Sequence, residues 1–113
     1  MIRLLPTVRI TSLEPQMVLA LRVVEDWMPD GVTVTCGEEG VHGPGTLHPK
    51  GRALDIRTHH LYVNDIVRTM KLGTLREKIG SCLGPDFDVV IEDLGGPNEH
   101  LHVEYDPKLR EGK

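Results

Sequence analysis

The chain is poor in aromatic residues and in cysteine. It has one Phe, one Trp and two Tyr among 113 residues, so we expect a core built mainly from Leu, Val and Ile. Its two isolated cysteines, Cys36 and Cys82, form neither a CxxC redox motif nor a zinc knuckle. We expect two reduced, partly buried thiols, with a disulfide between them as the alternative.

An excess of positive charge is also absent. Thirteen Lys and Arg residues against 17 Asp and Glu residues give a formal net charge of −4, so a nucleic-acid partner has no electrostatic support. A hydrophobic content of 39% and a charged content of 27% are ordinary for a globular chain. The length suits a single domain over residues 1–113.

Long apolar runs are missing as well. The first ten residues, MIRLLPTVRI, are too short an apolar run for a signal peptide, and no segment is apolar enough to cross a bilayer. We therefore expect synthesis in the cytoplasm and no membrane insertion. If the protein acts on a target outside the cell, another protein must release it.

Apolar residues at helical spacing predict two helices. The first runs from an N-cap at Ser12 to a stop at Pro29. Its expected buried face contains Leu13, Met17, Ala20, Leu21, Val24 and Trp27. The second is expected from about Val63 to Cys82. Its expected inner residues are Ile66, Val67, Met70, Leu75 and Ile79.

Alternating apolar and polar residues predict four strands, in GVTVTCG, RALDIR, FDVVIED and HLHVEY. A glycine-rich loop, residues 37–51, separates the first two, and loops of this length in small domains are usually functional or disordered. Helices and strands mixed in this order predict an α+β domain, with two main helices and a small antiparallel sheet.

Residues able to bind a metal lie in two separate segments. In HLHVEY the two-residue period puts His100, His102 and Glu104 on the face opposite the core residues. The same period takes Asp55 off the core face of RALDIR. If these strands are neighbours, Asp55 and His102 can meet, and His48 can close over them. Two imidazoles and one carboxylate leave a fourth position for water, as in catalytic zinc sites.

Both segments resemble motifs of one family. TLHPKGRALD, residues 46–55, fits the S/T-x-H-x-x-G-x-A-x-D motif of the D-alanyl-D-alanine carboxypeptidase family of zinc peptidases, with all five fixed positions matched. EHLH, residues 99–102, fits that family's second motif, E-x-x-H. The chain thus resembles the Hedgehog/DD-peptidase fold over residues 32–105. That fold also includes L-alanyl-D-glutamate endopeptidases carried by phages.

The resemblance implies a role for each motif residue. His48, Asp55 and His102 would bind Zn²⁺, and Glu99 would be the general base. These roles agree with zinc chemistry, because zinc brings the pKa of a water ligand toward ~7 and a nearby carboxylate can carry the proton to the leaving amine. Gly51 would allow a sharp turn between the first two ligands. Thr46 matches a small hydroxyl position that would orient the loop or the substrate.

His100 is a second catalytic candidate. The sequence H-L-H also resembles the HxH motif of wider lysostaphin-type and Hedgehog relatives, in which the first His lines the metal site and assists catalysis. We expect His100 to stabilise the transition state or to contact substrate. The alternative is a solvated neighbour of the site.

The chain departs from the family pattern at one position. The family commonly has an Arg after the first core strand, where it contacts the substrate carbonyl or carboxylate, whereas this chain has Glu38 and Glu39. A carboxylate cannot stabilise a developing oxyanion as Arg does. This counts against a strict DD-carboxypeptidase role and against catalysis itself. Arg52 or Arg57 would have to contact the substrate from another direction.

Together these features indicate a zinc-dependent metallopeptidase that cleaves peptide bonds of bacterial cell-wall peptidoglycan. The resemblance implies either the DD-carboxypeptidase or the L-Ala-D-Glu endopeptidase type, in a phage or prophage lysis enzyme. The alternative is a catalytically inactive zinc-binding module on the same fold, with a structural or interaction role. A third hypothesis, an α+β binding domain without metal, requires both motifs to be coincidence.

Overall fold

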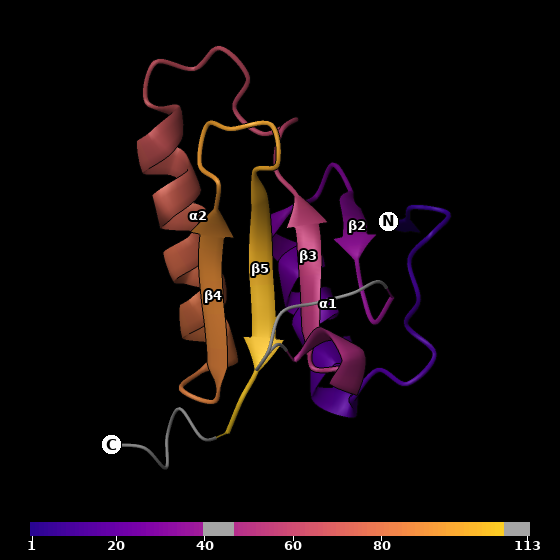
Figure 1. Cartoon of the computed structure of the whole chain (residues 1–113). Coiled ribbons are helices and arrows are strands. Elements are labelled where there is room, and N and C mark those ends of the chain that lie inside the picture. Colours follow the sequence, from indigo (N-terminus) through magenta and orange to yellow (C-terminus); the bar gives the residue numbers. More distant parts are fainter. Residues whose placement is uncertain (40–46, 108–113) are drawn as a thin grey trace.

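The computed structural model describes residues 1–39 and 47–107, which form one five-stranded sheet with two helices packed on it (Figure 1). The elements in chain order are β1 (Ile2–Leu4), α1 (Pro15–Trp27), β2 (Val32–Cys36), a 3-10 turn η1 (His48–Lys50), β3 (Ala53–Arg57), α2 (Arg68–Leu83), β4 (Phe87–Glu92) and β5 (His100–Tyr105). The strand order is β1-β2-β3-β5-β4. Among the described helices, none is long and apolar enough to cross a membrane.

The α+β class is confirmed, but the expectation of a purely antiparallel sheet is wrong. The pairs β2–β3, β3–β5 and β4–β5 are antiparallel, whereas β1 runs parallel to β2. Strand β1 was not predicted, because this edge strand has only three residues and all three are exposed, so it shows no alternation. The sheet is therefore mixed.

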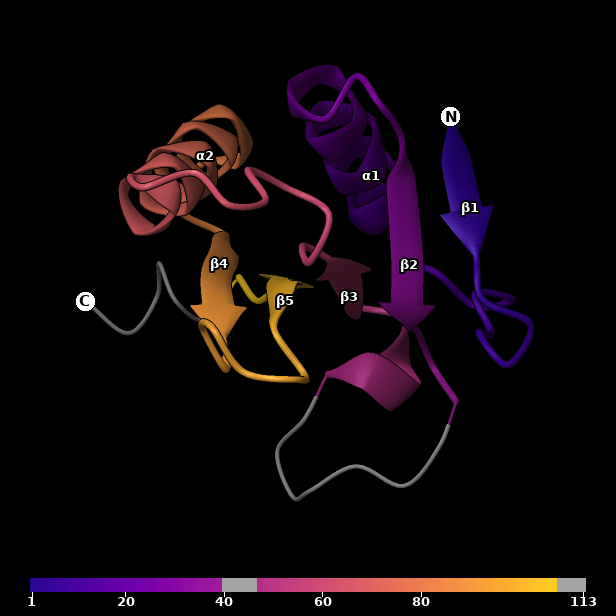
Figure 2. The same ribbon diagram turned by 90° about the horizontal axis from the view of Figure 1, so that it is seen from above.

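The helices cover one face of the sheet, and η1 lies on the other face (Figure 2). Apolar residues of both helices and of the sheet form the core between them. In α1 the predicted residues Met17, Ala20, Leu21 and Val24 are buried. Trp27 is instead 38% exposed, and its indole Nε1 lies 3.4 Å from the sulfur of Cys82.

Helix α2 begins later than predicted. Residues 63–67 precede it, and Ile66, Val67 and Met70 are exposed rather than inward-facing. The preceding segment cannot be helical, because Tyr62 and Asn64 have φ angles of 52° and 61°. The buried residues of α2 are Leu72, Leu75 and Ile79.

Strands β3 and β5 lie side by side, as the expected site requires. Their antiparallel register pairs Asp55 with His102 and Arg57 with His100. Leu54 of β3 is buried in the core, so the alternation of a strand directs Asp55 to the sheet face opposite the helices. We call this face, which carries η1, the open face.

Gly51 turns the chain between η1 and β3. Its φ of 69° is left-handed, and a Cβ on this residue would overlap the backbone carbonyl of Ser12. Its own carbonyl accepts a hydrogen bond from the Glu14 amide at 2.9 Å. Glycine therefore permits both the turn and the close approach of the chain before α1.

Replacing Gly51 with Ala should lower the free energy of unfolding by about 2 kcal/mol or more, because it adds left-handed strain to a backbone overlap. Urea unfolding measures the change. The control is Gly73→Ala in α2, where a Cβ meets nothing within 4 Å. That variant should be about 0.5–1 kcal/mol more stable than the parent. Equal stability of the two variants would contradict the role given to Gly51.

Candidate metal centre

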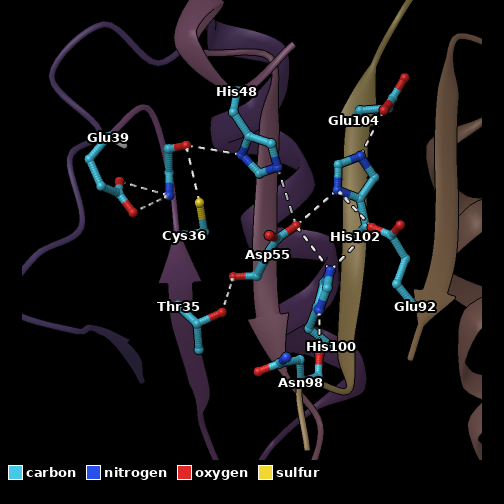
Figure 3. A network of polar contacts seen from close by, with 11 residues as sticks. Thr35, Cys36, Glu39, His48, Asp55, Glu92, Asn98, His100, His102 and Glu104 are labelled. Carbon is cyan, nitrogen blue, oxygen red and sulfur yellow. Dashed lines mark hydrogen bonds and ion pairs between the residues drawn. The ribbon is translucent and has the colours of Figure 1, made fainter. Parts of the chain in front are cut away.

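Asp55 lies at the middle of a cluster of imidazoles on the open face (Figure 3). Its Oδ1 atom is 2.8 Å from Nδ1 of His102 and 3.4 Å from Nε2 of His48. Nε2 of His100 is 3.6 Å from the same oxygen. The structure thus brings together the three residues expected to bind metal, with His100 beside them.

His48 is held in an orientation that suits a metal ligand. It is the first residue of η1 and is buried. Its Nδ1 lies 2.9 Å from the carbonyl oxygen of Gly37, which can only accept a hydrogen bond, so the proton of a neutral imidazole belongs on Nδ1. The lone pair of Nε2 then faces Asp55. Metal-binding histidines commonly donate their second N–H in this way.

The imidazole of His102 is also oriented by a hydrogen-bond acceptor. Its Nε2 lies 2.7 Å from a carboxylate oxygen of Glu104, which leaves Nδ1 facing Asp55. The His48 and His102 rings are edge to face, with centroids 5.2 Å apart. Two oriented imidazoles on either side of one carboxylate are a donor set that suits Zn²⁺.

The charges of the cluster are strongly coupled. Burial by itself lowers the pKa of His102, but hydrogen bonds with Asp55 and Glu104 outweigh it and raise that pKa to about 9. Burial raises the pKa of Asp55, but hydrogen bonds with His102 and His48 outweigh it and hold that pKa well below its usual range. A metal ion bound by His102 therefore displaces a proton from its imidazole.

His100 faces the same cluster, in agreement with the strand alternation. Its Nε2 lies 3.2 Å from Oε1 of Glu92, and its Nδ1 lies 2.7 Å from the carbonyl oxygen of Asn98. His100 is less buried than His48 or His102. It therefore stands toward the solvent side of the site.

Glu92, the last residue of β4, is a site residue that the sequence analysis did not identify. Its Oε1 is 3.2 Å from Nε2 of His100 and 3.6 Å from Nδ1 of His102. Glu92, Asp55, His100 and His102 each offer one ligand atom within 4.8 Å of the others. The register of the β4–β5 hairpin, which pairs Glu92 with His100, produces this placement.

Glu99 does not join the cluster, which corrects the expectation that it stands beside the metal ligands. Its buried carboxylate makes a bidentate ion pair with Arg68 of α2, with N–O distances of 2.6 and 2.8 Å. The Thr58 hydroxyl and the Gly95 amide donate to the same carboxylate. Hydrogen bonds from Arg68 outweigh burial and lower the pKa of Glu99 to about 2. Its carboxylate is directed toward the helix side of the sheet.

The two glutamates at the expected Arg position are structural. A carboxylate oxygen of Glu38 accepts a hydrogen bond from the Ser12 amide at 2.9 Å. The predicted N-cap at Ser12 is wrong, because α1 begins at Pro15 and its N-cap is Glu14. Oε1 of Glu39 accepts hydrogen bonds from the amides of Arg9 and Gly37, each at 2.9 Å. Both side chains tie the segment before α1 to the end of β2.

Of the two arginines considered for substrate contact, only Arg57 lies on the open face. Arg52 is placed away from the cluster, with Nε 3.5 Å from Glu14 and its guanidinium 5.6 Å from the Tyr105 ring centre. Arg57 pairs with His100 across the strands. It also lines a cavity of about 270 Å³. The cavity is lined by Leu5, Thr35, Arg57, His59, Pro97, Asn98, Glu99 and His100.

Cys36 borders the cluster from β2. Its sulfur, a nitrogen of His48 and an oxygen of Asp55 lie within 4.8 Å of one another. Burial raises the pKa of this thiol to about 12, so it is neutral in the metal-free protein. Cys36 and Cys82 form no disulfide with each other, in agreement with the predicted reduced thiols, although Cys82 is exposed rather than partly buried. Thr46 lies outside the described residues.

Comparisons with known proteins leave the family resemblance as an inference from the motifs. No protein-family model, no curated protein and no solved structure matches the chain significantly. Of the motif residues, His48, Asp55 and His102 lie together in the structure, whereas Glu99 pairs with Arg68.

Proposed function

We propose that the protein is a zinc-dependent metallopeptidase of the Hedgehog/DD-peptidase fold that cleaves peptide bonds of bacterial peptidoglycan. The observation that carries the proposal is the convergence of His48 and His102 on Asp55. Each imidazole has its second nitrogen held by an acceptor, the Gly37 carbonyl or the Glu104 carboxylate. Ligands of this kind favour zinc over the hard cations, which prefer oxygen.

In this proposal His48, Asp55 and His102 hold the ion. Zinc bound there would polarise the scissile carbonyl and activate water. The less buried His100 would stand on the side from which a peptide approaches, and its imidazole would hydrogen-bond the oxyanion that develops on the carbonyl oxygen. These roles follow from the order of burial within the cluster.

Arg57 would replace the Arg that the family has elsewhere. It is paired with His100 on the open face, and neighbouring side chains of such a cross-strand pair start about 5 Å apart. The structure records no carboxylate partner for Arg57 among residues 1–39 and 47–107. Its guanidinium is thus available to a carboxylate or carbonyl of the peptide. The motifs favour a small cell-wall peptide as the substrate. The protein would then be a phage or prophage lysis enzyme that another protein releases to the wall.

One observation favours the second candidate, an inactive zinc-binding module. The Glu of the E-x-x-H motif is fully engaged by Arg68, Thr58 and Gly95, so it has no free oxygen for proton transfer. Such a module would bind the metal through the same cluster but would not hydrolyse peptide bonds.

A muropeptide digest with the zinc-loaded protein tests the proposal. We expect mass spectrometry to show a new product that is absent with His48→Ala, since that change removes a buried ligand. Loss of a terminal D-Ala would identify a carboxypeptidase, and an internal cut an endopeptidase. Bound zinc without any product from several wall types would support the inactive module. Absence of zinc-linked thermal stabilisation would support a domain without metal.

A further inference from the structure

We infer that Glu92, and not the motif residue Glu99, is the carboxylate that transfers the proton in the reaction. The inference rests on the proposed function and adds to it a catalytic residue outside both motifs.

The hydrogen bonds of Glu99 exclude it as the group that transfers the proton. One of its oxygens accepts from Thr58 and Arg68, and the other accepts from Arg68 and the Gly95 amide. A carboxylate neutralised by a bidentate guanidinium is a weak base, and freeing it would leave Arg68 without its partner. Glu99 as a whole residue is 3% exposed, and its carboxylate faces Arg68 of α2.

Glu92 is placed by the β4–β5 hairpin. The register pairs Val90 with His102 and Glu92 with His100, so the alternation of β4 puts Glu92 on the open face. The turn that follows is closed by Asp93, whose carboxylate accepts from the Asn98 amide at 2.9 Å and whose carbonyl accepts from the Gly96 amide at 2.8 Å. A closed turn fixes the end of β4, and with it the start of the Glu92 side chain.

Glu92 is more exposed to solvent than the three residues proposed as metal ligands. The side chains of His48, His102 and Asp55 are 6%, 13% and 16% exposed, whereas that of Glu92 is 52% exposed. A catalytic zinc site keeps one position open to water and substrate. Glu92 borders that open side, within 3.6 Å of a His102 nitrogen, and solvent reaches it.

The reaction in which Glu92 takes part is the hydrolysis of a peptide bond. Water gives a proton to the Glu92 carboxylate as its oxygen forms a bond with the carbonyl carbon. The C–N bond then breaks, and the proton passes from Glu92 to the leaving amine nitrogen. Glu92 returns to a carboxylate, and the products are a carboxylic acid and an amine.

The test compares Glu92→Gln with Glu99→Gln in the full chain. We expect Glu92→Gln to bind zinc with the parent's stoichiometry but to lose ~10²–10⁴-fold in turnover of muropeptides, the usual contribution of a general base. Glu99→Gln should keep turnover within about threefold when assayed well below its melting temperature. Asp88→Asn is the matched control, because Asp88 belongs to the same strand and face but pairs with Glu104 rather than with His100.

A second readout is independent of turnover. The absorption spectrum of the Co²⁺-substituted protein reports the ligand set, and it should be the same for the parent and Glu92→Gln. Full activity of Glu92→Gln, or loss of the metal and a changed spectrum, would overturn the inference. Inactivity of Glu99→Gln with intact folding would also overturn it, in favour of the motif. A zinc-loaded parent without turnover would instead overturn the proposed function itself.

Discussion

Replacing Arg68 with Met should lower the free energy of unfolding by about 3–5 kcal/mol, because it leaves the Glu99 carboxylate buried without its cation. Arg68 also donates to the carbonyl oxygens of Leu61 and Thr58, at 2.9 and 3.1 Å, so it ties the turns before α2 to the start of β5. Urea unfolding followed by circular dichroism measures the loss.

The control for this variant is Arg76→Met, also in α2. Arg76 is half-exposed, and its ion pair within residues 1–39 and 47–107 is a 3.8 Å contact with Glu77, so its loss should change stability by no more than about 0.5 kcal/mol. The double variant Arg68→Met/Glu99→Leu should recover part of the lost stability, since it removes the unpaired charge. A single variant Arg68→Met as stable as Arg76→Met would show that the ion pair is not structural.

The same ion pair makes the free energy of unfolding depend on pH in the acid range. The pKa of Glu99 is lowered to about 2 in the folded protein, from an ordinary value of 4.5. The resulting stabilisation is therefore complete above about pH 4.5 and is lost as the pH falls toward 2, by up to about 3 kcal/mol. In Arg68→Met this part of the pH dependence should shrink.

The fold could be predicted wherever a two-residue alternation continues over five or six residues. Leu101 and Val103 of β5 are buried on the face that the alternation assigned to the core, and Val32 and Val34, which the alternation puts on one face of β2, are buried together. The alternation failed for β1, which is too short to show a period. Helical spacing also extended α2 wrongly to Val63, because nothing in the sequence shows the left-handed backbone that precedes the helix.

The site could be predicted in part for the same reason. Asp55 and His102 follow from alternation on two strands that turned out to be neighbours. Glu99 lies three positions before His102, an odd spacing that on a regular strand directs the two side chains to opposite faces. Glu92 required knowledge of the hairpin register, because the course of the turn over residues 93–99 decides which residue of β5 it faces. Tertiary pairing, which local patterns do not contain, decides such residues.

Replacing Asp55 with Ala should abolish zinc-linked stabilisation and turnover together. In the parent, zinc at one hundred times its dissociation constant should stabilise the fold by about 2.7 kcal/mol, which for a domain of this size raises the melting temperature by roughly 10 °C. Asp55 is the carboxylate that contacts all three imidazoles of the cluster, so without it the ion loses a ligand and its charge partner. Differential scanning fluorimetry with added ZnCl₂ measures the shift.

Asp88→Asn again supplies the control, because it removes one negative charge from the same sheet face without changing the cluster. It should keep the full zinc-dependent shift. A shift retained by Asp55→Ala but lost in Cys36→Ser would place the ion between β2 and η1 instead, next to the Cys36 sulfur and the His48 nitrogen that already lie close together. Zinc would then sit away from Glu92 and His100, and the proposed peptidase chemistry would lose its metal.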